Sequence, residues 1–282
     1  MKIAFHTLGC KVNQYESEAI AAAFEQQGYT VVDEREFADV YVINTCTVTA
    51  VADKKSRQYI RRMKKVNPDS VVVVTGCYAQ ISPEEVSAVD GVDIVAGTNE
   101  KSHLTDYVAE FQENGMRQLH VKGYEELDVY DETGLVVNTE NRTRAYIKIQ
   151  EGCNRFCSYC VIPYARGKVR SRGLSEIVAE AEKLIAGGYR EIVLTGIDIT
   201  SYRDGEHDLG DLLLALKDIP ARIRLGSLEE GVVTREFLEK MRAAGNVCEH
   251  FHLSLQSGSD AVLRAMNRRY TRRQYLDACA LI

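Results

Sequence analysis

The sequence predicts an α/β protein of two domains, a doubly wound parallel sheet followed by a partial β/α barrel. Apolar segments of strand length alternate with segments of helical periodicity in two series, and a polar stretch separates the series. The apolar segments are continuous, which is typical of parallel strands buried on both faces. With 282 residues, 45% of them hydrophobic, the chain is long enough to bury two cores.

The first series predicts a domain over residues 1–114 that alternates strands with helices. We expect strands at Lys2–His6, Val40–Asn44, Val71–Thr75 and Val92–Ala96. We expect helices at Gln14–Gln27, Ala50–Val66, Pro83–Val89 and Glu100–Asn114. No glycine-rich dinucleotide motif or P-loop follows any of these strands, so the sequence does not indicate a nucleotide-binding domain of either kind.

Residues 115–144 are polar with weak strand signals, and we interpret them as a linker or small hairpin. The second series, residues 145–282, predicts strands at Ala145–Gln150, Glu191–Thr195, Arg222–Gly226 and His250–Leu255. Its predicted helices are Ser175–Ala186, Leu209–Lys217, Thr234–Ala243 and Ser259–Met266. Four such units form only part of a barrel, whose working face is at the carboxyl ends of the strands. We therefore expect the barrel to be truncated at its C-terminus.

Composition and charge exclude several classes of protein. No run of 18 apolar residues is present, and the N-terminus lacks the apolar core of a secretory signal, so we expect a cytoplasmic protein without a membrane span. In that compartment the eight cysteines stay reduced, which favours metal binding or catalysis over disulfides. The net charge of −6 alone argues against a dedicated nucleic-acid binder.

Three cysteines with C-x3-C-x2-C spacing, Cys153, Cys157 and Cys160, follow the first strand of the second series. Three thiolates on one loop can hold a cubane iron–sulfur cluster and leave one of its four irons free for a small ligand. A zinc loop is the alternative, but structural zinc needs four protein ligands, and no fourth cysteine or histidine lies nearby in the sequence.

The loop with these three cysteines, and with Tyr159 before the last of them, resembles the cluster loop of the radical S-adenosylmethionine (radical SAM) superfamily. We therefore call Cys153, Cys157 and Cys160 the radical triad. The resemblance implies a [4Fe-4S] cluster whose open iron chelates the methionine moiety of SAM, and reductive cleavage of SAM to a 5′-deoxyadenosyl radical. In such enzymes the cofactor carries the difficult chemistry, while the protein orients it and excludes water.

A second set of cysteines follows strand ends in the first series. Cys10, Cys46 and Cys77 each come shortly after a predicted parallel strand, so all three should meet at one edge of the sheet, where open α/β folds place ligands. The alternative is that the three are unrelated buried cysteines, but this would not explain why each of them follows the end of a strand. We call this set the auxiliary triad and expect it to hold a second cluster. We interpret Cys248 and Cys279 as packing residues.

The order of the two triads resembles that in the methylthiotransferases, and the resemblance covers essentially the whole chain. The short sequence motifs are most similar to those of the branch that acts on threonylcarbamoyladenosine in tRNA. The matching stretches are His6–Asn13, Tyr41–Thr49, Asp53–Gln58 and Leu194–Asp198. The resemblance implies that a methylthio group replaces the C2 hydrogen of the modified adenosine at tRNA position 37. It also implies two [4Fe-4S] clusters, with one SAM as methyl donor and a second as radical source. We assign no catalytic residue beyond the cluster ligands.

The resemblance also implies partners: the anticodon stem-loop of tRNA, a sulfur donor and an electron donor such as flavodoxin or ferredoxin. By position at strand ends, the candidate SAM-contacting residues are Thr195, Gly196, Ser254, Gln256 and Ser257. Basic residues beside the two triads are candidates for phosphate contacts, although a charge run is usually a solvated face. The candidate tRNA contacts are Lys54, Lys55, Arg57, Arg61, Arg166 and Arg170.

Length is the departure from this family, because its members complete the barrel and add a small C-terminal β-domain. A fragment that binds clusters without catalysing is therefore one alternative function. A methylthiotransferase of the isopentenyladenosine branch is a second, although that branch typically begins Thr-Tyr-Gly-Cys-Gln-Met-Asn, unlike His6–Asn13. A zinc-binding structural protein is a third.

Overall fold

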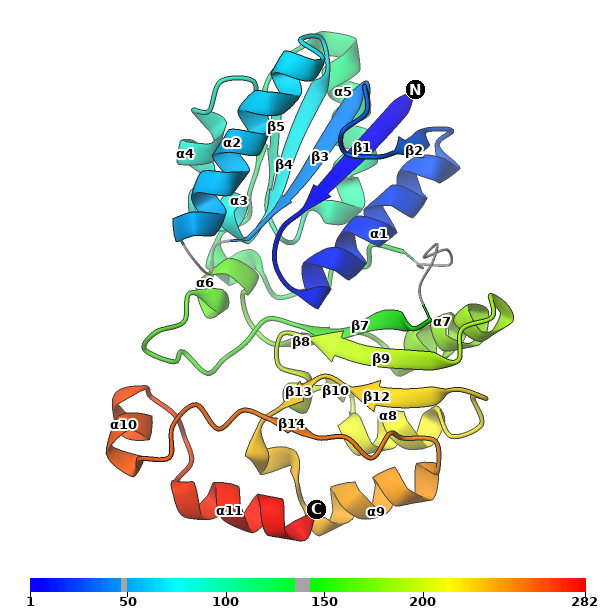
Figure 1. The fold of residues 1–282 in the computed structure, drawn as a ribbon, viewed down its shortest axis with the longest axis vertical. Helices are drawn as coiled ribbons and strands as arrows, with labels where there is room; N and C mark the ends of the chain where they lie inside the picture. Colours follow the sequence, from blue (N-terminus) through cyan, green and yellow to red (C-terminus); the bar gives the residue numbers. More distant parts are fainter. Residues whose placement is uncertain (47–49, 135–142) are drawn as a thin grey trace. The chain divides into compact units, whose positions relative to one another are not determined.

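The computed structural model describes residues 1–46, 50–134 and 143–282, apart from the side chains of residues 50–55. The chain forms two compact units (Figure 1). The first contains residues 1–136 together with a short later segment, Tyr164–Gly167. The second contains residues 137–163 and 168–282. The chain therefore leaves the first unit, returns to it for four residues, and leaves again.

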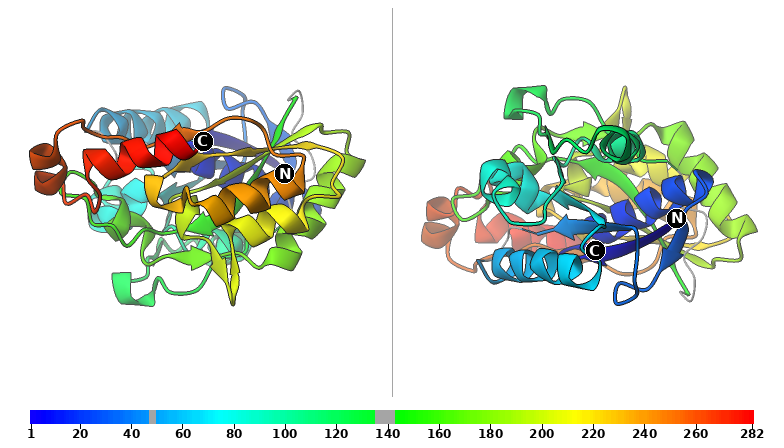
Figure 2. Two further views of the ribbon diagram at one scale, coloured as in Figure 1. Left: turned by 90° about the horizontal axis from the view of Figure 1, so that it is seen from below. Right: turned by 90° about the horizontal axis from the view of Figure 1, so that it is seen from above.

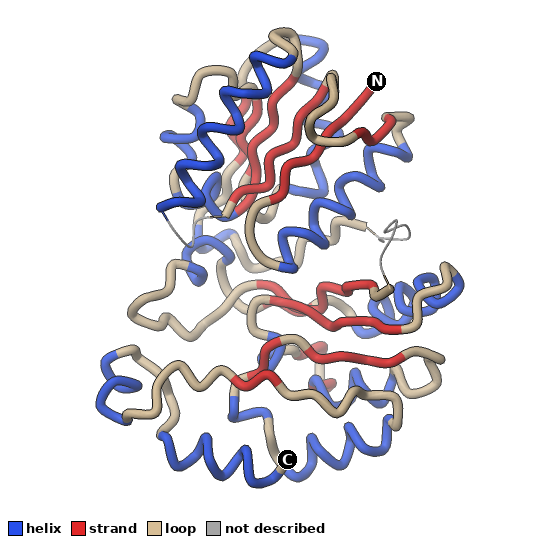
Figure 3. Tube along the Cα trace, in the orientation of Figure 1, coloured by secondary structure: helices blue, strands red, loops and turns tan. Residues whose placement is uncertain are grey.

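The first unit is built on a parallel sheet of six strands in the order β2-β1-β3-β4-β5-β6. Figure 3 draws the strands in red. The strands are β1 (Lys2–Thr7), β2 (Thr30–Val32), β3 (Val40–Thr45), β4 (Val71–Gly76), β5 (Ile94–Ala96) and β6 (Gln118–His120). Every residue of β3 and β4 is buried, as their unbroken apolar sequences predict. The order reverses beside β1, so the sheet is doubly wound as expected.

Helices cover both faces of this sheet (Figure 2). Ile20 and Phe24 of α1 (Lys11–Gln26) and Val108 of α5 (Leu104–Asn114) pack on one face. The other face is covered by α2 (Ala50–Val66), α3 (Cys77–Ile81) and α4 (Pro83–Ser87). The short 3-10 helices η1 (Lys101–His103) and η2 (Tyr124–Glu126) complete the unit. Burial of apolar side chains on both faces stabilises a parallel sheet.

The prediction of a linker over 115–144 is wrong for part of that stretch. Residues 118–120 form β6, which pairs in parallel with β5 through Ile94↔Gln118 and Ala96↔His120. The strand has three residues and none of them is fully buried, so it lacks the apolar run that identifies a strand in sequence. The edge strand β2 is equally short and was not predicted for the same reason.

The second unit contains a sheet in the order β12-β9-β7-β8, a parallel pair β13-β14, and a small hairpin β10-β11. Its strands are β7 (Ala145–Glu151), β8 (Arg170–Ser171), β9 (Glu191–Gly196), β10 (Arg203–Asp204), β11 (His207–Asp208), β12 (Arg222–Leu225), β13 (Ser227–Leu228) and β14 (His252–Leu253). Its helices are α6 (Ile162–Arg166, whose last residues belong to the first unit), α7 (Leu174–Ala186), α8 (Leu209–Ala215), α9 (Arg235–Ala244), α10 (Asp260–Ala265) and α11 (Arg272–Leu281), with 3-10 helices η3 (Ile199–Ser201) and η4 (Glu230–Val232).

Four consecutive βα units are present, as predicted. Strands β7, β9 and β12 pair in parallel, and β13, one residue beyond β12, pairs in parallel with β14. The predicted fourth strand, 250–255, is shorter in the structure, because only His252 and Leu253 pair with β13. The backbone turns at Gln256, where φ is +59°. Helices α7, α8 and α9 bury their apolar faces in one core with these strands. Within the described ranges, no helix combines the length and apolar character that crossing a bilayer requires.

Candidate functional site

The auxiliary triad lies at the carboxyl ends of three neighbouring strands. Cys10 follows β1 and precedes α1, Cys46 follows β3, and Cys77 follows β4 as the first residue of α3. Because β1, β3 and β4 are adjacent in the sheet, the three thiols meet at one edge. Cys46 and Cys77 are buried and Cys10 is exposed, and all three are free thiols.

Two glycines allow the three loops to approach each other. A Cβ atom on Gly9 would lie 3.0 Å from Cβ of Cys46 and 3.2 Å from its sulfur. A Cβ atom on Gly76 would lie 2.4 Å from the carbonyl oxygen of Thr45, and its backbone has φ +97° and ψ −167°. Only glycine adopts that conformation readily. The residue before each of Cys10 and Cys77 is therefore glycine for a steric reason.

Asn13 on the first turn of α1 joins two of these loops. Its Nδ2 donates to the carbonyl oxygen of Leu8 (2.7 Å) and to that of Thr45 (2.9 Å). The sulfur of Cys10 lies 3.9 Å from Asn13 Oδ1. The side chain is buried, so both bonds are protected from water and fix the Cys10 loop against the strand that leads to Cys46.

Arg166 supplies a buried positive charge to this edge of the first unit. Its side chain is fully buried, its Nε donates to the sulfur of Cys77 (3.2 Å), and its Nη1 donates to Oε1 of Glu16 (2.7 Å). Its Nη2 donates to Oδ1 of Asn13, and the ammonium group of Lys101 binds the other oxygen of Glu16. Burial raises the pKa of Cys77, and the charge of Arg166 opposes that shift.

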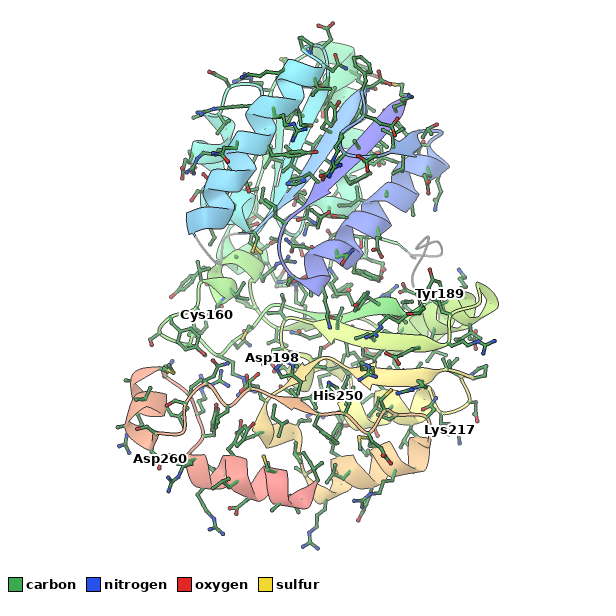
Figure 4. All side chains as sticks on the ribbon, viewed as in Figure 1. Cys160, Tyr189, Asp198, Lys217, His250 and Asp260 are labelled. Atoms are coloured by element: carbon green, nitrogen blue, oxygen red, sulfur yellow. The ribbon has the colours of Figure 1, made fainter. Side chains whose placement is uncertain are left out.

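The radical triad lies on the loop that follows β7. Gly152 (φ +74°) and Phe156 (φ +49°) turn the backbone sharply, and the amide of Cys160 donates to the carbonyl oxygen of Cys157 (2.9 Å). Burial raises the pKa of Cys153 to about 11, and the backbone amide of Arg155 opposes this shift. Figure 4 labels Cys160 on this loop and Asp198 beyond β9, while Tyr189 lies where β9 begins.

The segment between α10 and α11 holds this loop in place. The amide of Ser158 donates to the carbonyl oxygen of Met266 (3.1 Å), and Nδ2 of Asn267 donates to that of Phe156 (2.9 Å). Asn267 has φ +56°, a conformation that asparagine tolerates better than most residues. Arg268 donates to the sulfur of Cys157 (3.4 Å) and also binds Glu229. Cys157 is the buried member of the triad, so this cation lies beside its least hydrated thiol.

The residues of both triads are chemically compatible with an iron–sulfur cluster, because each triad supplies three free thiols. Among the residues that the structure describes, no three His, Cys, Asp or Glu side chains converge closely enough to hold one ion. In a cubane each thiolate binds a different iron, so the sulfurs need not meet at one point. An arginine donor beside one sulfur of each triad also suits thiolate ligands, since it offsets the cost of burying their charge.

The SAM-contact candidates occupy two strand ends of the second unit. Thr195 is buried, and Gly196 lies against Gln150, because a Cβ atom there would be 2.8 Å from the Gln150 carbonyl oxygen. Ser254, Gln256 and Ser257 lie at and beyond the end of β14. The hydroxyl group of Tyr270 hydrogen-bonds the carbonyl oxygens of Ser254 (2.8 Å) and Leu255 (2.5 Å). Contact of these five residues with SAM stays a prediction.

The candidate tRNA contacts differ in burial and in their hydrogen-bond partners. Arg166 and Arg170 are buried, so the prediction that they contact phosphates on the surface is wrong for this fold. Arg57 is half-buried and binds both Tyr78 (2.6 Å) and Glu85 (2.8 Å). Arg61 is exposed on α2 and stays a candidate. The side chains of Lys54 and Lys55 lie outside the described residues.

Sequence reasoning missed the residues that support the triads. Asn13 and Glu16 lie one turn apart on the buried side of α1, and a buried polar pair in an otherwise apolar stripe was an available signal. In the second unit, Nε of Arg155 donates to Asp198 (3.1 Å), so the cluster loop is joined to the end of β9. No sequence pattern reveals that pair, because its members are 43 residues apart.

Comparison with known proteins finds two families that match successive parts of the chain. The family described as "Uncharacterized protein family UPF0004" matches residues 2–97, and the radical SAM superfamily matches residues 147–282. The chain is 46% identical to threonylcarbamoyladenosine tRNA methylthiotransferase MtaB of Bacillus subtilis, over 98% of this chain and 62% of that protein. It is 43% identical to the MtaB protein of Aquifex aeolicus, over 98% of this chain and 68% of that protein. The chain belongs to the MtaB-type radical SAM methylthiotransferase family.

The other branch of the family is also similar. A tRNA-2-methylthio-N(6)-dimethylallyladenosine synthase of Clostridium novyi is 37% identical, over 96% of this chain and 62% of that protein. The chain thus spans about three fifths to two thirds of the length of the curated relatives it matches. Among solved structures, the radical SAM methyltransferase TsrM of Kitasatospora setae has a TM-score of 0.70 at 17% identity, covering 99% of this chain and 67% of that one. That likeness shows the fold alone.

Proposed function

We propose that this chain carries the cluster-binding and radical-generating part of a tRNA methylthiotransferase. The reaction would replace the C2 hydrogen of N6-threonylcarbamoyladenosine at tRNA position 37 with a methylthio group. The observation that carries the proposal is the auxiliary triad, with Cys10, Cys46 and Cys77 at three adjacent strand ends. A second set of cluster ligands is what sulfur insertion would require beside the radical triad, because the inserted sulfur needs a site of its own.

In this proposal the two triads have different tasks. Cys153, Cys157 and Cys160 would hold the cluster that cleaves SAM, and Cys10, Cys46 and Cys77 would hold the auxiliary cluster. When bound, the clusters and SAM would supply the radical that activates C2 and the sulfur and methyl group that replace its hydrogen. Holding these reactants in one orientation is the contribution that the protein makes to the rate.

The residues around each triad would position it and exclude water. Asn13 fixes the Cys10 loop, and Asn267 fixes the Cys157 loop, through hydrogen bonds to backbone carbonyl groups. Two of the auxiliary thiols and one radical-triad thiol are buried, which keeps water from those three sulfurs. The electron donor, a small redox protein such as flavodoxin or ferredoxin, the sulfur donor and the cytoplasmic location belong to the same proposal.

Anaerobic reconstitution with iron and sulfide tests the cofactor set. Two clusters give about eight irons per chain and one gives about four. Cys157→Ala should abolish reductive SAM cleavage, whereas Cys46→Ala should leave cleavage measurable and eliminate methylthiolated RNA. A Cys46→Ala variant that still methylthiolates would show that the auxiliary triad is not the sulfur site. Cys248→Ala is the matched control, because Cys248 is buried but belongs to neither triad.

The isopentenyladenosine branch is the second candidate, because the tRNA-2-methylthio-N(6)-dimethylallyladenosine synthase of Clostridium novyi is 37% identical to this chain. The two candidates differ in substrate alone. Anticodon stem-loop RNA carrying threonylcarbamoyladenosine should gain the methylthio mass, and the same RNA carrying isopentenyladenosine should not. The opposite result would assign the chain to the other branch.

Basic residues on α2 would contribute to tRNA binding, with Arg61 as the candidate that the structure shows to be exposed and Lys54, Lys55 and Arg57 as the others predicted. Each lost phosphate contact should reduce the salt dependence of binding by about one unit of slope. Arg61→Gln should therefore weaken tRNA binding and leave iron content unchanged. Arg117→Gln is the control, because it removes an equally exposed positive charge just before β6, where the strands of the same sheet begin.

A further inference from the structure

Arg166 stands out because its side chain is fully buried and three of its nitrogen atoms reach polar atoms beside the auxiliary triad. We propose that Arg166 is a positioning residue of this triad, and that its hydrogen bond to Cys77 raises the reduction potential of the cluster held there. The inference rests on the proposed function in one respect, since it takes Cys77 to be a cluster ligand.

The geometry separates three tasks of one guanidinium group. Nη2 orients Asn13, whose own amide group fixes the Cys10 loop, and Nη1 binds Glu16 on the next turn of α1. Nε is left for the sulfur of Cys77 at 3.2 Å. A planar fork of donors can make all three contacts at once, whereas a lysine ammonium group is a point charge. The residue type is therefore matched to the site.

The contact with Cys77 has an electrostatic consequence. A charged donor hydrogen-bonds an anionic sulfur strongly, and more so in a buried site than in water. Hydrogen bonds to the ligand sulfurs and net charge are among the factors that set the potential of an iron–sulfur cluster. One-electron reduction adds negative charge to the cluster, so a cation and donor beside Cys77 stabilise the reduced form more than the oxidised form. Loss of Arg166 should make the cluster harder to reduce.

The charges around Arg166 allow its effect on the reduction potential to be separated from its effect on the stability of the fold. The contacts join two cations, Arg166 and Lys101, to two anions, Glu16 and the ligand thiolate of Cys77. Arg166→Gln leaves this group with a net charge of −1. Adding Glu16→Gln restores neutrality but does not restore the donor to Cys77. The double variant should therefore recover the stability that the single variant loses, because an uncompensated buried charge is the costly defect.

The experiment uses the full chain with Cys153, Cys157 and Cys160 changed to alanine, so that only the auxiliary triad can hold a cluster. Iron content, the thermal unfolding midpoint and the reduction potential, followed by electron paramagnetic resonance, are measured for this parent. The same measurements follow for Arg166→Gln and for Arg166→Gln combined with Glu16→Gln. Arg170→Gln is the matched control, because Arg170 is equally buried but donates to the carbonyl oxygen of Lys168 (3.2 Å).

We expect Arg166→Gln to lower both the unfolding midpoint and the reduction potential. The double variant should regain most of the unfolding midpoint while its potential stays below that of the parent, and Arg170→Gln should leave the potential unchanged. A double variant with the potential of the parent would overturn the inference, since Arg166 would then only compensate charge. A parent that assembles no cluster would overturn the proposed function and the inference together, and its iron content distinguishes that result from the previous one.

Discussion

Gly76→Ala is the substitution that best tests how the auxiliary triad is assembled. Gly76 ends β4 immediately before Cys77, with φ +97° and ψ −167°. The added Cβ would lie 2.4 Å from the carbonyl oxygen of Thr45 and 2.6 Å from Oδ1 of Asn44. The first of these is a backbone atom of a buried strand, so it cannot move aside without shifting β3. The change therefore acts on the spacing between Cys46 and Cys77.

Two costs add in this variant. The glycine-only backbone conformation costs about 1–3 kcal/mol for another residue, and forcing a carbon atom into a packed site typically costs about 1–3 kcal/mol more. The sum is roughly 2–6 kcal/mol out of the 5–15 kcal/mol by which a typical protein is stable. Each kcal/mol lowers the unfolding midpoint by about 2–4 °C in a protein of this size class.

Gly28→Ala is the matched control for strain without crowding. Gly28 also has a positive φ, +84°, but an added Cβ would find no atom within 4 Å. This variant should lose only about 1–2 kcal/mol and keep its iron. The thermal unfolding midpoint and the iron content of the two reconstituted variants are the measurements that compare crowding with backbone strain. If Gly76→Ala unfolds at the temperature of Gly28→Ala and retains all its iron, close approach of β4 to Thr45 is not what sets the triad.

Three further substitutions test other parts of the structure. A hydrogen bond from Arg224 lowers the pKa of Glu191 below its ordinary value of 4.5. The ionised carboxylate therefore stabilises the fold above about pH 4.5, and this contribution is lost as the pH falls through the lowered pKa. Glu191→Gln should thus reduce the dependence of the unfolding free energy on pH in the acid range. Tyr270→Phe should cost about 1–2 kcal/mol and weaken SAM binding measured by calorimetry, because its hydroxyl group holds the turn after Ser254. Asn267→Gly keeps the positive φ but removes the amide that anchors the cluster loop, so a chelator should extract iron from this site faster while the unfolding midpoint changes little.

The fold was predictable where the sequence repeats a periodic signal. The helix over Ala50–Val66 has the predicted bounds, and the buried strands β3 and β4 each differ from prediction by one residue. Continuous apolar runs and helical periodicity are local properties, so they can be detected without tertiary information. Strands of two or three residues, such as β2 and β6, were not predictable because pairing with a neighbour, rather than their own residues, makes them strands.

The cysteine positions were predictable for a related reason, while their surroundings were not. A cysteine that follows a parallel strand must lie at one edge of the sheet, whatever the loop does. The partner of Cys77 is different, because Arg166 is 89 residues away in the chain. Its position after the radical triad suggested a surface contact with RNA, and only the folded structure shows that it is buried in the other unit.

The return of residues 164–167 to the first unit has a consequence for synthesis of the chain. Domains generally fold as units while the chain emerges, at about 5–20 residues per second. Here the first unit cannot be completed when residue 136 has been made, because the carboxylate of Glu16 still lacks the arginine that binds it. Roughly thirty more residues, or about 2–6 s of translation at that rate, separate the sheet from its last piece. Lys101, which also binds Glu16, is synthesised well before Arg166, and the loop of the radical triad is synthesised before Arg166 as well.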